Sequence, residues 1–129
     1  MKRAKWIIKD SGKRKVFKSG MVRDTADDKI EYWRIFIGPL LKRYAAHITK
    51  GAAKYPDPKP GVPNWTRAVG EEELLRFRDS LARHFFQYMN GELDEDHASA
   101  VVFNLNGAEY VKERMKRGKS AVRRKDRRA

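Results

Sequence analysis

The stretch EEELLRFRDSLARHFFQYMNGELDEDHASAVVFNLNGAEYV (71–111) holds two helical patterns, one before and one after Gly91. The first pattern places apolar residues three and four positions apart, the spacing of one helix face: Leu74, Phe77, Leu81, Phe85 and Tyr88. Three glutamates at 71–73 suit the positive end of a helix dipole, and Gly91 suits a helix end. We therefore predict a helix that begins near residue 71 and ends at Gly91.

Two more helices are expected from the sequence. The second half of the quoted stretch predicts a helix from near Asp96 to about residue 117, with an inner face formed by His97, Val101, Asn104, Ala108 and Val111. The segment PLLKRYAAHITKGAAKY (39–55) predicts a helix from Pro39 to Gly51, because proline suits a first helical position and glycine a helix end.

The remaining segments contain little regular structure. Residues 56–63 hold four prolines, which remove backbone donors and disfavour helix, so we expect a stiff loop there. Two short segments, KWIIK (5–9) and KVFKS (15–19), could form a hairpin around Ser11-Gly12. The predicted fold class is mostly α: a compact bundle of three or more helices with a short N-terminal β-hairpin.

The positive charge of the chain lies at its two ends. The 129 residues carry a formal charge of +13; residues 1–23 hold nine Lys/Arg and one acid, and residues 112–129 hold ten and two, so the middle is mildly acidic. We expect a basic N-terminal segment (1–23), a helical catalytic domain (24–113) and a flexible basic tail (114–129). Basic ends can bind nucleic acid weakly through counterion release, and they also serve simply to keep a protein in solution.

Composition excludes several classes of protein. The chain has no cysteine, so disulfide scaffolds, thiol nucleophiles and cysteine-bound zinc are excluded. No apolar run approaches the roughly 18–20 residues of a membrane span, and the start has no signal-peptide core. We therefore expect a soluble cytoplasmic protein without membrane contact.

The segment GELDEDHASAVVFN (91–104) concentrates acidic residues in this basic chain. It contains four carboxylates and a histidine within six positions: Glu92, Asp94, Glu95, Asp96 and His97. Asp94 or Asp96 could cap the following helix, which explains one or two acids but not four. Alternatively, oxygen ligands at a helix start suit Mg²⁺ or Mn²⁺, with a histidine or Asn104 as an outer partner. Both readings stay open, as does a role for His97 as an ordinary hydrogen-bonded core residue.

Further candidate residues lie on the two preceding segments. On the helix 71–91, Asp79 and Arg83 could form a surface pair, and Asp79 and His84 point too far apart to share one ion but could line one cleft. On the helix 39–51 and just beyond it, a basic stripe is either a solvated face or a set of phosphate-binding groups: Arg43, His47, Lys50 and Lys54. Asn64 and Trp65 could bind a nucleobase or fill the core. Metal ligands, cations and an aromatic residue together indicate a nucleotide substrate.

Several of these residues occur in a recognisable arrangement. GAAKY (51–55), NW (64–65), RH (83–84), GE (91–92), Asp94 or Asp96, His97 and Asn104 resemble the dATP/dGTP diphosphohydrolases of bacteriophages. That family is grouped with the all-α, MazG-like NTP pyrophosphatases, and the resemblance covers roughly residues 10–113. It implies metal-dependent hydrolysis of a purine dNTP to the monophosphate and pyrophosphate, in the cytoplasm of an infected host cell if the chain is phage-encoded.

The resemblance also implies roles for the candidate residues. The metal ligands would be Glu92, Asp94 and Asp96, and the catalytic groups Asp79, His84, Glu92 and His97. The substrate-binding groups would be Lys50, Lys54, Asn64, Trp65, Arg83 and Asn104. A second histidine is common three positions after His97, but Ala100 stands there, and the ExxE of residues 92–95 has no following ExxD. The resemblance therefore implies a cleft rather than a fixed ligand list.

Two other expectations concern partners and alternative functions. The family relationship and the apolar residues Leu75 and Phe86, which lie off the main face of their helix, predict a homo-oligomer, a dimer or a tetramer. The alternatives to an enzyme are a non-enzymatic nucleic-acid-binding protein that acts through its charged ends, and a degenerate family member kept as an interaction scaffold.

Overall fold

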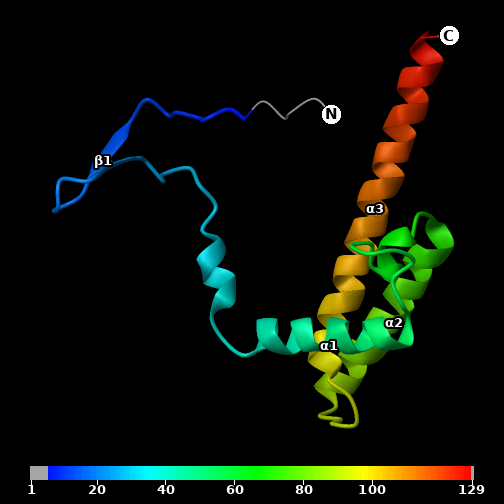
Figure 1. Ribbon diagram of the computed structural model, residues 1–129. Coiled ribbons are helices and arrows are strands. Elements are labelled where there is room, and N and C mark those ends of the chain that lie inside the picture. The colour runs from blue at the N-terminus through cyan, green and yellow to red at the C-terminus, as the bar shows by residue number, and fades with distance from the viewer. Residues whose placement is uncertain (1–5, 129) are drawn as a thin grey trace. The chain divides into compact units, whose positions relative to one another are not determined.

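The computed structural model describes residues 6–128, which form two units, residues 6–36 and 37–128 (Figure 1). The first unit holds the strands β1 (Arg14–Val16) and β2 (Val22–Asp24) and the 3₁₀ helix η1 (Tyr32–Phe36). The second holds the helices α1 (Leu40–Lys54), α2 (Glu71–Met89) and α3 (His97–Arg128) and the 3₁₀ helix η2 (Asn64–Arg67). The predicted fold class, mostly helical with a short N-terminal hairpin, is confirmed.

The hairpin lies further along the chain than its predicted position. β1 and β2 are antiparallel, with Arg14 opposite Asp24 and Val16 opposite Val22. The reversal occurs at Gly20, whose φ of 89° favours glycine, rather than at Ser11-Gly12. Residues 6–9 of the predicted strand 5–9 have no regular structure, and Lys5 lies outside the described residues. The Ser11 hydroxyl binds the Asp24 carboxylate instead, so the polar side chains fix where the strands pair.

The second unit is built on the antiparallel pair of α2 and α3. Their interface contains the buried apolar core, formed by Leu74, Ala108 and Val111, with Phe77 and Met115 packed beside it. A Cβ atom on Gly107 would overlap the Phe77 ring, so this glycine lets the two helices approach closely. α1 packs mainly on α3.

Two helix ends differ from the sequence-based prediction. α1 does not end at Gly51 but continues to Lys54, because Ala52 and Ala53 favour helix and Pro56 then disfavours it at Tyr55. The segment expected as a flexible tail is helical as far as Arg128, and this part of α3 extends beyond the start of α2 (Figure 1). Lysine, arginine and alanine are good helix formers, and no proline interrupts the segment.

α2 has the predicted limits. It begins at Glu71, where the Glu73 carboxylate accepts a hydrogen bond from the Gly70 N–H at 3.2 Å. It ends at Met89, and Gly91 follows with a φ of 72°, a conformation that glycine adopts without strain. Among the described residues, no helix is long and apolar enough to cross a membrane.

Candidate metal centre and adjoining pocket

The connection between α2 and α3 ends in a firmly held helix cap. The Asp96 carboxylate accepts hydrogen bonds from the Ser99 N–H at 3.1 Å and the Ser99 hydroxyl at 2.9 Å, which is the bonding of an N-cap residue. It also accepts two bonds from the Arg43 guanidinium of α1, at 2.6 and 3.0 Å. Arg43, and to a lesser degree Ser99, hold the pKa of Asp96 well below its usual range. Asp96 therefore caps α3 and ties α1 to it.

Two histidines face each other across the interface of α2 and α3. The Nδ1 atoms of His84 and His97 are 2.9 Å apart, and the side chain of His97 is buried, with 2% of the residue exposed. The other ring nitrogen of His97, Nε2, lies 2.7 Å from the Asp94 carboxylate. This contact with His97 lowers the pKa of Asp94. Because a carboxylate accepts a hydrogen bond, Nε2 of neutral His97 carries the proton and Nδ1 offers a lone pair toward His84.

A third group joins the two histidines. His84, Glu95 and His97 each offer a ligand atom, and these atoms all lie within 4.8 Å of one another. Glu95 is exposed, His84 is half-buried, and burial is the main cause that lowers the pKa of His84. Neutral imidazole is the form that binds metal ions. The arrangement of two imidazoles and one carboxylate could therefore hold a divalent ion.

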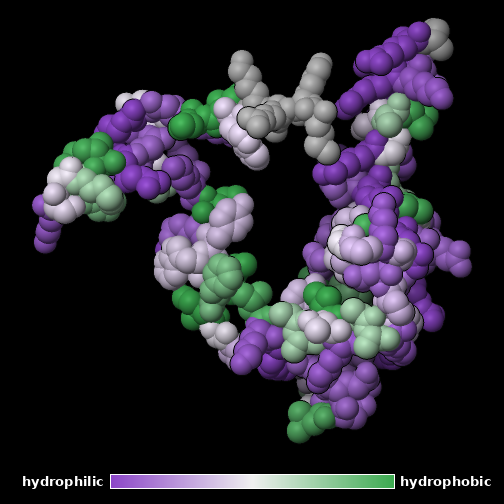
Figure 2. All heavy atoms as spheres, in the orientation of Figure 1, coloured by the Kyte–Doolittle hydropathy of each residue, from purple (hydrophilic) through white to green (hydrophobic). Residues whose placement is uncertain are grey.

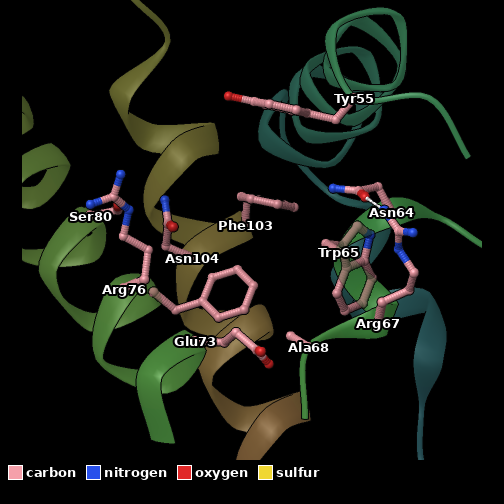
Figure 3. Close-up of a pocket in the computed structure, with 11 residues that line it drawn as sticks. Tyr55, Asn64, Trp65, Arg67, Ala68, Glu73, Arg76, Ser80, Phe103 and Asn104 are labelled. Atoms are coloured by element: carbon pink, nitrogen blue, oxygen red, sulfur yellow. Dashed lines mark hydrogen bonds between the residues drawn. The ribbon is translucent and has the colours of Figure 1, made fainter. Parts of the chain in front are cut away.

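A pocket of about 470 Å³ lies between α2, α3 and the segment 55–68 (Figure 3). Its wall carries the aromatic residues Trp65, Phe77 and Phe103, and Tyr55 lies on the side of α1. The pocket size and its mixture of aromatic and polar groups are those of a site for a small organic molecule. The polar groups that line it are Asn64, Arg67, Glu73, Arg76, Ser80 and Asn104.

Two residues of α3 anchor the segment that carries Trp65. The Tyr110 hydroxyl donates a hydrogen bond to the Thr66 carbonyl at 2.9 Å, and Arg114 donates to the same oxygen at 2.8 Å and to the Ala68 carbonyl at 3.0 Å. The Trp65 ring packs edge-on against Tyr110, with ring centroids 5.1 Å apart. The indole is thus held in place at the pocket wall by η2, which follows the proline-rich loop.

The pocket and the histidine pair are neighbours along the same helices. Ser80 of the pocket lies one turn before His84 on α2. Asn104 of the pocket lies seven residues after His97 on α3, a rise of about 10 Å. Since the two helices are antiparallel, His84 and His97 both lie on the same side of the pocket along the helix axes. A molecule of nucleotide length could therefore contact both the pocket and the candidate metal ligands.

A family model described as dATP/dGTP diphosphohydrolase, N-terminal, matches residues 19–120, which is most of the chain and includes the pocket and the histidine pair. The chain belongs to this family. The resemblance inferred from the sequence motifs is thereby confirmed. The comparison with curated proteins and the comparison with solved structures gave no match. The family is named for hydrolases of dATP and dGTP, and its model describes an N-terminal domain, so the match supports a hydrolase without specifying the catalytic step.

In this member of the diphosphohydrolase family, the structure brings together some of the candidate site residues that the sequence indicated. Asp94, His84 and His97 form one cluster, and Asn64, Trp65 and Asn104 line one pocket. The Asn104 side chain is buried and donates to the Ala100 carbonyl at 2.8 Å. The Lys54 ammonium lies 5.1 Å from the ring centroid of Tyr55, at the edge of the pocket.

The other predicted residues are not among the three groups that converge at the histidine pair. Glu92 is half-buried and accepts a bond from the Asn90 amide at 3.3 Å, and Asp96 is engaged by Arg43 and Ser99. Neither is among the three groups that converge. Lys50, Asp79 and Arg83 are exposed, and the charge of Arg83 contributes to the lowered pKa of His84.

Several residues at the site were not singled out from the sequence. Glu95 was one of four acids in a row, and helix periodicity cannot show which carboxylate of an irregular turn faces a histidine. Ser80 was also missed, although it lies three residues after Phe77 and four before His84, so the helical spacing of these two residues could have identified it. Phe103 and Arg76 gave no distinguishing signal.

Proposed function

We propose that this chain hydrolyses purine deoxynucleoside triphosphates to the monophosphate and pyrophosphate, with Mg²⁺ or Mn²⁺ arriving on the triphosphate. One observation supports the proposal above the others: an aromatic pocket lies one to two helical turns from a cluster of two imidazoles and a carboxylate. Membership of the dATP/dGTP diphosphohydrolase family points to the same substrates.

The chain's own residues would bind the two ends of the nucleotide. Trp65 and Phe103 offer aromatic faces and edges to the base, and the amide groups of Asn64 and Asn104 offer hydrogen bonds to its edge. Lys54, whose ammonium lies near the ring of the pocket residue Tyr55, and the exposed Lys50 and Arg83 would hold the phosphates.

The α-phosphate would lie near the cluster of His84, Glu95 and His97. The ion that arrives on the triphosphate would compensate its charge and lower the pKa of a bound water. His84 is suited to this place because burial disfavours its charged form. The departing pyrophosphate gains charge during the reaction, which nearby cations stabilise.

The experiment is product analysis with each of the four dNTPs, in the presence of Mg²⁺ or Mn²⁺. We expect pyrophosphate and a monophosphate in equal amounts, with faster turnover of dATP and dGTP than of dCTP and dTTP. Release of inorganic phosphate with a diphosphate, or no turnover of any dNTP, would contradict the proposal. Glu92→Gln tests the ligand list implied by the motifs, since only that list makes Glu92 a metal ligand.

We further propose that the basic end of α3 contacts nucleic acid weakly. Residues 112–128 form one continuous helix about 25 Å long, and Figure 2 shows that its surface is mostly hydrophilic. Only two of its cations pair with an acid of the described residues: Lys112 with Glu109, and Arg117 with Glu113. Arg114 binds the Thr66 and Ala68 carbonyls, and the remaining cations of this segment are available for phosphates. This contact is an accessory to the enzyme or, if no turnover is found, the chain's main activity.

We also propose that the chain forms a homo-oligomer, a dimer or a tetramer, in the cytoplasm. α2 leaves large apolar side chains exposed in the single chain: Leu75, Phe85, Phe86 and Met89. Exposed apolar residues in such number are typical of a protein interface. Light scattering after size-exclusion chromatography measures the molar mass and tests this proposal. Phe86→Glu should shift that mass toward the mass of a monomer.

A further inference from the structure

We propose that His84, Glu95 and His97 form a resident site for a first-row transition-metal ion, such as Zn²⁺ or Co²⁺, that is filled before any nucleotide binds. This site is separate from an ion that arrives with a triphosphate. The proposal goes beyond the hydrolysis of dNTPs and does not depend on it, because binding of the ion is measured on the nucleotide-free chain.

The separation of the two histidines fits two ligands of one ion. Their Nδ1 atoms are 2.9 Å apart. Two nitrogens that each lie about 2.1 Å from an ion, at right angles to each other, are about 3.0 Å apart. Two ligand atoms on opposite sides of the ion would be about 4.2 Å apart. The three ligand atoms here lie within 4.8 Å of one another, so they need to move only slightly closer to bind one ion. The exposed Glu95 side chain is free to make this small movement.

Asp94 fixes which nitrogen of His97 is available. The Asp94 carboxylate lies 2.7 Å from Nε2, so this nitrogen donates and Nδ1 keeps its lone pair. A carboxylate that binds the far nitrogen of a ligand histidine is the usual outer partner of a metal site, and it also raises the basicity of the imidazole. Asp94 is thus a positioning residue rather than a ligand.

The ligand types distinguish between metal classes. Imidazole nitrogen suits zinc, iron, cobalt and nickel, whereas Mg²⁺ prefers oxygen ligands in octahedral geometry and retains much of its water. Two histidines and one carboxylate leave coordination positions open for water or a phosphate oxygen. The donor set therefore fits a transition-metal ion better than the Mg²⁺ expected from the run of carboxylates.

The direct experiment measures metal binding by the full chain, first stripped of metal and free of nucleotide. Equilibrium dialysis with Zn²⁺ and Co²⁺ should give a single tightly held ion per chain, and the Co²⁺ absorption spectrum should report nitrogen ligation. Millimolar Mg²⁺ should not displace it. His84→Gln and Glu95→Gln should each weaken binding by more than the roughly 10- to 100-fold loss expected for an outer partner. His84 is half-buried and Glu95 is exposed, so we expect both variants to fold, and their folding can be checked.

The controls use other carboxylates of the same segment and helix. Glu109→Gln, on an exposed side chain paired with Lys112, should leave the affinity unchanged, and so should Glu92→Gln. Asp94→Ala should weaken binding roughly 10- to 100-fold. Asp94→Asn retains an oxygen acceptor and should restore part of that loss. Nitrogen chemical shifts of His97 should show the Nε2–H tautomer in the wild type and a mixture in Asp94→Ala.

Three outcomes would overturn the proposal. The first is Zn²⁺ affinity that is equal in the wild type, His84→Gln and Glu95→Gln, which would mean that the ion binds elsewhere. The second is displacement by Mg²⁺ at similar concentration, which would indicate an oxygen-ligand site. The third is a loss in Glu92→Gln as large as that in Glu95→Gln, which would favour the acidic ligand list. None of these outcomes bears on whether dNTPs are hydrolysed.

Discussion

His97 of α3 and His84 of α2 meet through their Nδ1 atoms at 2.9 Å, and Asp94 holds the opposite nitrogen of His97 at 2.7 Å. The turn between the two helices thus supplies the orienting carboxylate, while the helices supply the imidazoles. The pair lies one to two helical turns from the pocket that contains Trp65, so a candidate metal site adjoins a pocket lined by aromatic residues.

The stability of the metal-free chain should depend on the protonation of His84. Burial lowers the pKa of His84 below 6.5, so the folded chain binds this proton more weakly than the unfolded chain. The free energy of unfolding should therefore be largest above pH 6.5 and fall as the pH drops through that value. Urea unfolding at pH 7.5 and 5.5, with a chelator present, should show a larger loss in the wild type than in His84→Gln. An equal loss in both would contradict the assignment.

Gly107→Ala should destabilise the fold although alanine favours helix. The new Cβ would overlap the Phe77 ring, and overpacking of this kind costs roughly 1–3 kcal/mol. Gly118→Ala is the matched control on the same helix, because nothing lies within 4 Å of its Cβ position. The control should stabilise the chain by up to about 1 kcal/mol. Thermal unfolding of both variants checks the opposite signs, and adding Phe77→Leu to Gly107→Ala should recover part of the loss.

Asp96→Ala should lower stability through the cap of α3 rather than through metal binding. Loss of an N-cap carboxylate costs about 1 kcal/mol, and the Arg43 contact between α1 and α3 is lost with it. Chemical denaturation of Asp96→Ala measures the loss of stability. Arg43→Gln isolates the part that comes from the Arg43 contact, and Lys42→Gln, at an exposed position of the same helix, is its control. If Asp96→Ala abolished Zn²⁺ binding without changing stability, Asp96 would be a ligand and its role as cap secondary.

Trp65→Ala should weaken nucleotide binding, because stacking of a base on an aromatic ring contributes about 1–3 kcal/mol. That range corresponds to an increase in the dissociation constant for dGTP of roughly 5- to 150-fold. Trp65→Phe should retain most of the affinity, and Trp33→Ala, in the exposed η1, is the control. Calorimetry on folded variants provides the measurement. An unchanged affinity in Trp65→Ala would move the base away from this pocket.

Deletion of residues 121–129 separates the two proposed activities. The deletion spares Arg114 and Met115, which hold the pocket segment and the core. We expect binding to duplex DNA to weaken and to lose much of its salt dependence, because several cations are removed. Turnover of dNTPs should persist. Loss of turnover with retained folding would show that the basic end belongs to the active site.

The helices could be predicted from the sequence because their apolar spacing and terminal residues agree. For α2, the glutamates at 71–73 and Gly91 mark both ends, and the structure follows them. For α1, Gly51 suggested a helix end, but the helix continues to Lys54. The helix propensity that a single glycine loses is smaller than the stabilisation from the further backbone hydrogen bonds. The hairpin was misplaced because short exposed strands have weak patterns, and side-chain bonds such as Ser11 with Asp24 decide their pairing.

The candidate site was predictable only where helices carry it. His84, His97 and Asn104 lie on helix faces that the periodicity identifies, and Asp96 was one of two expected caps. The choice among Glu92, Asp94 and Glu95 depends on the backbone path of an irregular turn, which no periodicity encodes. The sequence therefore indicated acid beside histidine without showing that Glu95 faces the imidazoles and Asp94 orients one of them.

A single measurement combines substrate, chemistry and site: phosphorus NMR of dGTP incubated with Mn²⁺ and the wild type, Glu95→Gln or Glu109→Gln. We predict dGMP and pyrophosphate from the wild type and from Glu109→Gln at similar rates, and at least a 100-fold slower reaction with Glu95→Gln. Formation of no dGMP by the wild type, or equal rates for Glu95→Gln and the wild type, would contradict hydrolysis at the histidine pair.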